Sequence, residues 1–152
     1  MYKKCLVPLD GSELAECALN HVKSLVKEKT VGEVTILNVV KVDIPWSEFS
    51  EKKTIDLEAL RKPLFAAARK YLADVESRLS AEGISVKTAA IEGNRPGETI
   101  IGYAQENGMS LIVMATHGHT GFKQLLLGSV ATRVLHESPV PVLLIRPESC
   151  RP

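Results

Sequence analysis

The sequence predicts an α/β fold in three layers, with a parallel β-sheet between two layers of helices. Short apolar runs alternate with helical patterns along the chain, and this alternation implies right-handed crossovers between parallel strands. Most of the runs are continuously apolar, as is typical of strands covered on both faces. The five expected strands are Cys5–Leu9, Val34–Val40, Val86–Ile91, Leu111–Ala115 and Val142–Ile145.

Helical periodicity predicts one helix after each of the first four strands. Pro63 is expected to open the second helix, because a proline in a helix interior removes a hydrogen bond and clashes with the preceding turn. Gly83 is expected to end that helix as a left-handed cap. The connection from Lys41 to about Leu60 should become helical only late. The other helices are expected around Leu14, Ala18, Val22 and Leu25, from Pro96 to Asn107-Gly108, and from Ser129 to Ser138-Pro139.

Length and composition indicate one globular domain over residues 1–152, with 45% hydrophobic and 24% charged residues. This balance excludes disordered and collagen-like chains. With 19 basic and 18 acidic residues the formal net charge is +1, which leaves no broad field to attract nucleic acid or an anionic membrane. The apolar start stops at Asp10, too early for a signal peptide or a membrane span. We therefore expect no membrane insertion and a cytoplasmic protein.

The three cysteines are Cys5, Cys17 and Cys150, and any single pairing leaves one thiol over. They include no CxxC pair. Cys5 lies in an apolar run and Cys17 on a helical stretch, where a buried free thiol is the usual state. This cysteine usage fits a reducing cytoplasm.

A ligand is expected beyond the carboxyl ends of the strands, at the point where the strand order reverses. Pro8–Ser12 and Asn38–Val40 lie at two of these ends, and Ala115–Ser129 leaves a third. Gly128-Ser129 opens the next helix, where unpaired backbone N–H groups, a hydroxyl and the positive end of the helix dipole suit an anionic phosphate.

These segments resemble parts of the universal stress protein family. The run Met114-Ala115-Thr116-His117-Gly118, then nine residues and Gly128-Ser129-Val130, resembles the nucleotide loop of the ATP-binding branch. The family pattern there is glycine, two residues, glycine, nine residues, then glycine and serine or threonine. Lys4–Ser12 resembles the family's first strand and turn, and Ser138–Ile145 its last strand. The resemblance implies a five-stranded parallel sheet of order 3-2-1-4-5, Rossmann-like and similar to the adenine nucleotide alpha-hydrolases.

The resemblance also implies an adenine nucleotide, ATP or else AMP or ADP, as the bound cofactor. Adenine would lie near Pro8, Leu9 and Val39. Asp10 would lie by the ribose and phosphates, where it could meet a phosphate-bound Mg²⁺. Gly128, Ser129 and Val130 would hold the phosphates, and the rest of the site would come from the loop residues Met114, Ala115, His117 and Gly118.

Ala115 departs from the family pattern, which has its first glycine at this position. A methyl group is tolerated at a strand end if φ stays negative, but it narrows the approach of the backbone to a ligand. The substitution of glycine by Ala115 therefore leaves both tight and weakened ATP binding compatible with the sequence.

Several of these residues also have a purely structural interpretation. Asp10 could cap the first helix, with Glu13 completing a D-x-x-E capping box. Gly118 could be an ordinary loop glycine. His117 and His119 flank Gly118, but no cysteine or carboxylate lies near them at metal-ligand spacing, so no metal site and no catalytic residue are assigned.

The expected function is a regulatory nucleotide-binding module of the stress response with weak or no hydrolysis. A slow ATPase, or autophosphorylation on Ser129 or a loop threonine, is the alternative, although the absence of a Walker lysine from the loop disfavours fast phosphoryl transfer. A dimeric interaction module that binds no nucleotide is a further alternative. Receiver-like and adenylating enzymes fit poorly, because Glu92-Gly93 ends the third strand and Asp10-Gly11-Ser12 holds a single glycine.

The last expected strand, Val142–Ile145, is short, apolar and bounded by Pro141 and Pro147. An unprotected sheet edge of this kind tends to pair or to be covered. The family resemblance implies a homodimer formed through this strand.

Overall fold

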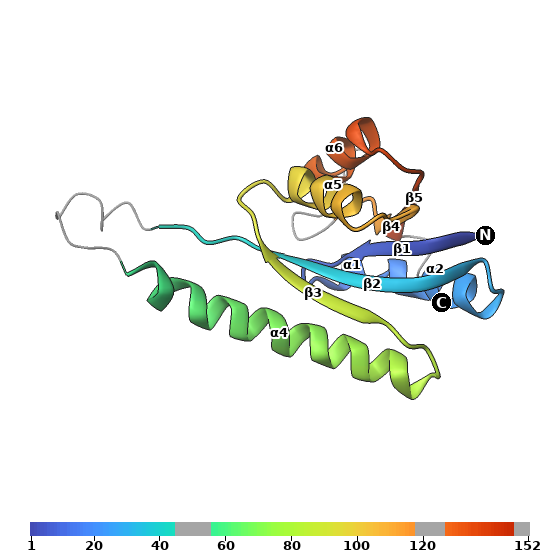
Figure 1. The fold of residues 1–152 in the computed structure, drawn as a ribbon, viewed down its shortest axis with the longest axis horizontal. Coiled ribbons are helices and arrows are strands. Elements are labelled where there is room, and N and C mark those ends of the chain that lie inside the picture. Colours follow the sequence, from blue (N-terminus) through green and yellow to red (C-terminus); the bar gives the residue numbers. More distant parts are fainter. Residues whose placement is uncertain (45–55, 118–126, 148–152) are drawn as a thin grey trace.

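A computed structural model of the chain describes residues 1–44, 56–117 and 127–147, which form a three-layer α/β fold (Figure 1). Five parallel strands make one sheet in the order β3-β2-β1-β4-β5. The predicted fold class and strand order are therefore confirmed. The strands are β1 (Tyr2–Pro8), β2 (Val31–Val40), β3 (Lys87–Glu92), β4 (Leu111–Ala115) and β5 (Val142–Ile145).

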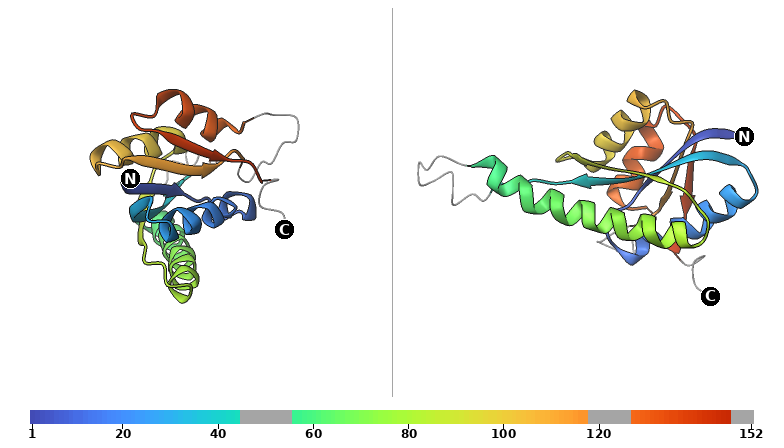
Figure 2. Two further views of the ribbon diagram at one scale, coloured as in Figure 1. Left: turned by 90° about the vertical axis from the view of Figure 1, so that its right-hand side faces the viewer. Right: turned by 60° about the horizontal axis from the view of Figure 1, so that its bottom comes forward.

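Helices cover both faces of the sheet, as Figures 1 and 2 show. Helices α1, α2 and α4 pack on one face, and α5 and α6 pack on the other. The predicted limits of α5 and α6 agree with the structure. The helices are α1 (Glu13–Glu16), α2 (Ala18–Lys27), α4 (Leu57–Ala81), α5 (Pro96–Glu106) and α6 (Ser129–Glu137).

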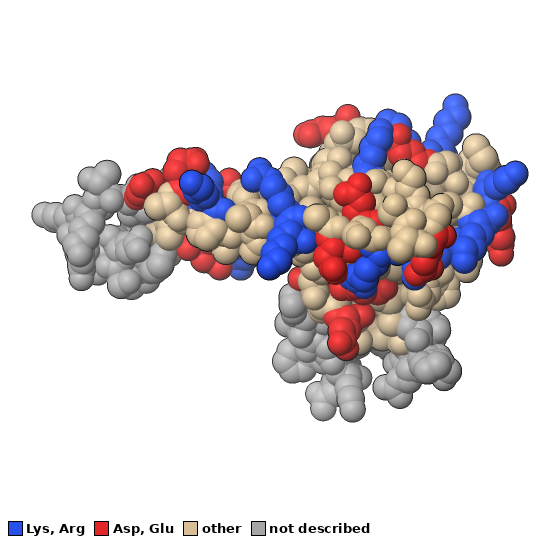
Figure 3. All heavy atoms as spheres, turned by 90° about the horizontal axis from the view of Figure 1, so that it is seen from below, with Lys and Arg blue, Asp and Glu red and all other residues tan. Residues whose placement is uncertain are grey.

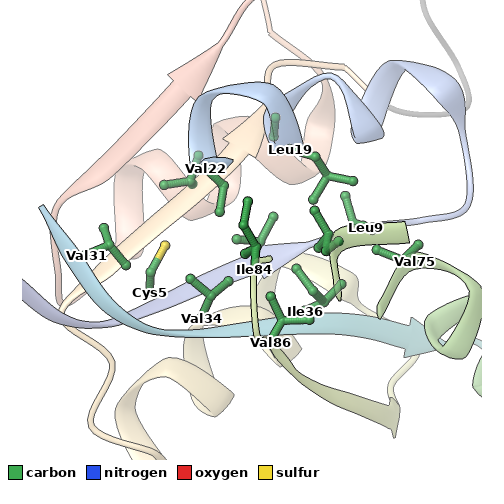
Figure 4. Packing of buried hydrophobic residues seen from close by; sticks show 14 of the residues in the cluster. Cys5, Leu9, Leu19, Val22, Val31, Val34, Ile36, Val75, Ile84 and Val86 are labelled. Carbon is green, nitrogen blue, oxygen red and sulfur yellow. The ribbon is translucent and has the colours of Figure 1, made fainter. Parts of the chain in front are cut away.

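Strand β1 lies at the centre of the sheet and is buried on both faces. Cys5, Leu6 and Val7 are each 0% exposed. Successive side chains of a strand point to opposite faces, so Cys5 and Val7 pack under α2 and α4 while Leu6 packs under α5 and α6. Figure 4 shows the first of these clusters, in which Cys5 and Leu9 lie among Val31, Val34 and Ile36 of β2. The continuously apolar sequence of β1 follows from this double coverage.

The single helix expected after β1 is two helices in the structure, divided at Cys17. The Cys17 N–H bonds to the Leu14 carbonyl oxygen at 3.3 Å, three residues back, which is the tighter 3₁₀ pattern. This bond interrupts the regular ladder after one turn, and the chain restarts as α2. Cys17 is half-buried and is one half of a disulfide, so the prediction of a buried free thiol is wrong for Cys17 and correct for Cys5.

Helix α4 begins six residues before Pro63, so the prediction that Pro63 opens it is wrong. Asp56 is the N-cap, and its side-chain oxygen accepts a hydrogen bond from the Ala59 N–H at 3.2 Å. Asp is among the strongest N-cap residues. Arg61 in the second turn is bonded to Glu92 at the end of β3, with Nε 3.1 Å from Oε2. The cap and the ion pair hold the turns that precede the proline.

The carboxyl end of α4 agrees with prediction. Gly83 has φ +79°, a conformation that glycine adopts without strain. Its N–H bonds to the Ser80 carbonyl at 2.9 Å, and the Ile84 N–H bonds to the Leu79 carbonyl at 3.0 Å. These two bonds are the pair that closes a Schellman motif.

A polar contact joins α1 to α4. The Tyr71 hydroxyl donates to Glu16 Oε2 at 3.0 Å, and Arg78 Nη2 lies 2.7 Å from Glu16 Oε1. Burial, and then the hydrogen bond to Glu16, raise the pKa of the Tyr71 phenol above its ordinary value. The same carboxylate raises the pKa of Arg78. Helix α1 is thereby fixed to the longest helix of the fold.

Acidic and basic side chains are interspersed over α4 and the neighbouring face of the sheet domain (Figure 3). This mixture agrees with the net charge of +1. Within the part of the chain that the structure describes, no helix is long and apolar enough to cross a membrane.

Two leucines of α4 test how this helix packs. Leu72 is 3% exposed and Leu64 is 40% exposed. Leu72→Ala should lower the free energy of unfolding by about 2–5 kcal/mol, because it removes a fully packed side chain. Leu64→Ala should lower it by less than about 1 kcal/mol. Urea unfolding measures both values, and equal losses would contradict the packing of α4 described here.

Candidate ligand-binding site

A pocket of about 280 Å³ opens at the carboxyl ends of the central strands. It lies where β1 has β2 on one side and β4 on the other, the point at which the strand order reverses. Ligands of open α/β sheets bind at this place. Its walls come from β1, α1, β2, α5, β4 and the start of α6. The lining residues are Pro8, Leu9, Asp10, Ala15, Leu37, Val39, Pro96, Ile100, Met114, Ala115, Thr116, His117, Gly128, Ser129, Val130 and Ala131.

The structure brings together all the predicted site residues that it describes. Pro8, Leu9, Asp10, Val39, Met114, Ala115, His117, Gly128, Ser129 and Val130 line this one pocket. Gly118, together with His119 and Lys123, lies outside the described residues.

The end of β1 is held rigidly against β2. The Leu9 N–H bonds to the Leu37 carbonyl at 2.8 Å, and the Asn38 amide nitrogen donates to the Leu9 carbonyl at 2.9 Å. Both backbone groups of Leu9 are therefore satisfied by β2. This pairing fixes the direction in which the chain leaves β1 toward Asp10.

Asp10 does not cap α1, so that structural interpretation is wrong. The N-cap is Ser12, whose hydroxyl oxygen accepts from the Ala15 N–H at 3.1 Å. Asp10 Oδ1 instead accepts from the Ser12 N–H at 3.0 Å and from the Ser12 hydroxyl at 2.6 Å. Asp10 is exposed and lines the pocket. Among the described lining residues it is the one Asp, Glu, Lys or Arg.

Thr116 and Gly128 close the two ends of the loop after β4 onto each other. The Gly128 N–H bonds to the Thr116 carbonyl at 2.8 Å, and the Thr116 N–H bonds to the Ile145 carbonyl at 2.9 Å. A Cβ at position 128 would lie 3.1 Å from that Thr116 oxygen, tighter than an ordinary contact. Glycine at this position therefore allows the close approach of the two segments.

The first turn of α6 places backbone donors at the edge of the pocket. Gly128 is the N-cap, and Ser129 is the first helical residue rather than the cap. The first intrahelical bond of this turn runs from the Thr132 N–H to the Gly128 carbonyl, at 2.9 Å. The N–H groups of Ser129, Val130 and Ala131 precede it and have no acceptor within the helix. All three residues line the pocket, at the positive end of the helix dipole.

Ala115 has a negative φ, since Lys29 is the non-glycine residue recorded with a positive one in the described chain. The condition under which a methyl group is tolerated at the end of β4 is therefore met. Ala115 is buried and lines the pocket.

His117 is half-buried, and its Nδ1 lies 2.9 Å from the Thr116 hydroxyl oxygen. This contact orients the ring at the mouth of the pocket. Within residues 1–44, 56–117 and 127–147, no group of three His, Cys, Asp or Glu side chains is placed to hold a metal ion.

Six wall residues were not anticipated from the sequence. Leu37 and Thr116 immediately neighbour predicted positions, so the strand-end rule could have included them. Pro96 and Ile100 belong to α5, which reaches the pocket only through packing of the helix layer, and no local motif indicates this. The other two are Ala15 and Ala131.

A parallel sheet of order 3-2-1-4-5 with a pocket at its reversal point defines a doubly wound α/β domain with a candidate ligand-binding site. Within this class, the model of the universal stress protein family matches residues 1–146. The chain is 35% identical over 161 residues to the universal stress protein MJ0577 of Methanocaldococcus jannaschii, and the alignment covers 96% of each chain. The chain therefore belongs to the universal stress protein family.

Solved structures agree with this assignment. The structure of MJ0577 superimposes with a TM-score of 0.80 and 96% coverage of both chains. A universal stress protein solved in complex with cAMP shares the fold, with 20% identity, a TM-score of 0.63 and coverage of 95% and 97%. So does a family protein of Arabidopsis thaliana solved with AMP bound, with 15% identity, a TM-score of 0.65 and coverage of 95% and 91%.

Gly128→Ala tests the contact between Thr116 and the start of α6. The added methyl group meets the Thr116 carbonyl, and alanine is a poorer N-cap than glycine, so the free energy of unfolding should fall by about 1 kcal/mol. Gly102→Ala in α5 is the matched control. A Cβ there meets no atom within 4 Å, and the protein should gain up to about 1 kcal/mol. Thermal and urea unfolding measure both, and a stabilised Gly128→Ala protein would contradict the contact.

Proposed function

We propose that this protein binds an adenine nucleotide in the pocket between β1, β4 and α6, as a regulatory module with weak or no hydrolysis. The observation that carries the proposal is the arrangement of the pocket, which joins an apolar wall to three N–H groups of α6 that have no acceptor within the helix. The AMP-bound and cAMP-bound family structures support it, because each carries an adenine nucleotide on the same fold.

The apolar wall suits a purine base. Leu37, Val39, Ile100 and Met114 contribute aliphatic and thioether surface from three elements. A base buried against such surface is stabilised by removal of apolar area from water. Specificity for adenine would come from a few polar groups fixed at the wall, as in most small-molecule sites.

The first turn of α6 suits the phosphates. Backbone N–H groups at a helix N-terminus bind phosphate with the help of the dipole. Asp10 adds a negative charge to the same pocket, so a phosphate beside it needs a counter-charge. We propose that Mg²⁺ has this role when ATP is bound and that Asp10 is the protein group that would contact the ion. AMP has a single phosphate and so needs less counter-charge.

Phosphoryl transfer requires positioned cationic groups around the transferred phosphate. The described walls offer backbone N–H groups and Asp10 instead, which favours binding over turnover. Slow hydrolysis or autophosphorylation on Ser129 is the alternative proposal. A module that binds no nucleotide is the other, and Ala115, which lines the pocket where the family pattern has glycine, is the residue that would account for it. We also propose a cytoplasmic location.

Two substitutions at one residue separate the roles of the α6 backbone and of the Ser129 hydroxyl. Ser129→Pro removes an N–H and is compatible with the helix, since proline is favoured at the first helical position and Gly128 is extended with φ −68° and ψ 164°. A lost hydrogen bond to a charged phosphate should weaken ATP binding about tenfold. Ser129→Ala keeps the N–H and should weaken binding less. Calorimetric titration of nucleotide-stripped protein with ATP, AMP and GTP, with and without Mg²⁺, measures this.

Equal melting temperatures of the wild type and both variants serve as the control for folding. Unchanged ATP affinity in Ser129→Pro would place the phosphates elsewhere. The absence of binding by any nucleotide to the wild type would contradict the proposed function itself. Release of inorganic phosphate from bound ATP would favour the slow ATPase.

We further propose that β5 forms a homodimer through its free edge. Leu143 is 38% exposed, whereas Val142 and Leu144 also pack against the cluster under α5 and α6. Leu143→Asp should therefore give a monomer, because the charge lies at the edge without entering the core. Leu57→Asp on α4 is the control, with 37% exposure. Sedimentation velocity reports the change, and a Leu143→Asp dimer as tight as the wild type would refute this interface.

A further inference from the structure

We infer that Gly97 is a positioning residue for nucleotide binding, because it sets how closely α5 approaches α6 beside the candidate site. The inference rests on the proposed function and adds to it a residue that is not itself in the pocket wall. Gly97 is buried at the second position of α5. Pro96 before it and Ile100 one turn later both line the pocket.

Gly97 lies against the side of α6 that carries Arg133, and Figures 1 and 2 show the two helices side by side. A Cβ at position 97 would lie 2.7 Å from the Arg133 Cγ and 2.9 Å from its Cβ, well inside the normal separation of carbon atoms. The Arg133 Cβ is fixed to the α6 backbone, so a change of rotamer cannot relieve the second contact. A side chain at position 97 therefore has to move one helix away from the other.

The close approach, and not the backbone conformation, is the reason for glycine at position 97. The glycines recorded with a positive φ in the described chain are Gly11, Gly83 and Gly108, so the φ of Gly97 suits any residue. Glycine is also less favourable than alanine within a helix. Gly102 of the same helix has no described atom within 4 Å of its Cβ position. The two glycines of α5 therefore differ in contact alone.

An ion pair joins the same two helices. Arg133 Nη1 lies 3.6 Å from Glu98 Oε1 of α5 and 2.8 Å from Glu137 Oε1 of α6. Arg95 Nη1 lies 3.3 Å from the same Glu98 oxygen. All these side chains are partly exposed, and exposed ion pairs contribute little to stability. The packing of the aliphatic part of Arg133 on Gly97 therefore sets the spacing of the helices, with the ion pair beside it.

This contact lies between the two parts of the proposed nucleotide site. Ile100 belongs to the apolar wall proposed for the base, whereas Ser129 and Val130 carry N–H groups proposed for the phosphates. Gly97 lies one turn before Ile100 and faces the turn of α6 that contains Val130 and Arg133. Because base and phosphate are covalently joined through the ribose, both parts of the site must lie at one spacing. Gly97 is the residue that allows this spacing.

The experiment compares the affinities of the nucleotide-stripped full chain for AMP and for adenosine by calorimetric titration. AMP contacts both parts of the site and adenosine lacks the phosphate, so the ratio of the two affinities reports how well α6 is placed relative to the base. Gly97→Ala should lower this ratio about three- to tenfold, because a displaced N–H forms a weaker hydrogen bond to the phosphate. Gly102→Ala is the matched control and should leave the ratio unchanged.

Arg133→Gly is the rescue variant, because it removes both atoms that the new methyl group would meet. In the Arg133→Gly background, Gly97→Ala should no longer lower the ratio. A merely structural role would change the melting temperature without changing the ratio. Gly97→Ala should also melt about 2–4 °C below the wild type, whereas Gly102→Ala should not.

A ratio that is unchanged in Gly97→Ala, or lowered equally in Gly102→Ala, would overturn the inference and leave the proposed function intact. A lowered ratio that Arg133→Gly does not restore would overturn the part assigned to the contact between α5 and α6. The absence of AMP and adenosine binding to the wild type would instead contradict the proposed function, and this inference with it.

Discussion

The fold depends on β1, which must be covered on both faces and paired on both edges. Its residues Cys5, Leu6 and Val7 are fully buried, so a helix layer is required above and below it. Its edges pair with β2 on one side and β4 on the other. The chain adds β2 and β3 on one side of β1 and then β4 and β5 on the other side. The helices that follow β1 and β4 therefore lie on opposite faces of the sheet. The pocket lies between the starts of these helices, so the topology determines its position.

The sequence predicts the strands well because strands that are buried on both faces are continuously apolar. Leu111–Ala115 and Val142–Ile145 have the same bounds in the prediction and in the structure. The first strand begins earlier than its apolar run, at Tyr2, whose N–H bonds to the Thr30 carbonyl at 2.8 Å. Ladder bonds of this kind involve only the backbone, so hydrophobicity cannot locate them. The sequence therefore places the strands, while the backbone ladder sets where they begin.

Predictions of helix starts were wrong where two sequence signals for a start lay close together. Proline at position 63 suggests a helix start, but the cap at Asp56 and the ion pair of Arg61 favour an earlier one. Asp10 and Ser12 are both good caps, and only the geometry of the turn selects Ser12. The part of the candidate site that lies in the strand ends and at the start of α6 was predictable, because short sequence motifs mark these segments. Its wall from Pro96 and Ile100 depends on how the helix layer packs, which no short motif encodes.

Glu16 contacts Tyr71 and Arg78, and these contacts determine how helix α1, which contains the wall residue Ala15, responds to alkaline pH. Both proton donors have pKa values raised in the folded state. The stabilisation by such groups is complete below their unfolded pKa values and is lost only as the pH rises through the higher folded ones. Helix α1, and with it the turn through Asp10 and Ser12, therefore stays anchored to α4 throughout the neutral and mildly alkaline range. A phenol that resists ionisation thus keeps its hydrogen bond between the first helix and the longest one in mildly alkaline solution.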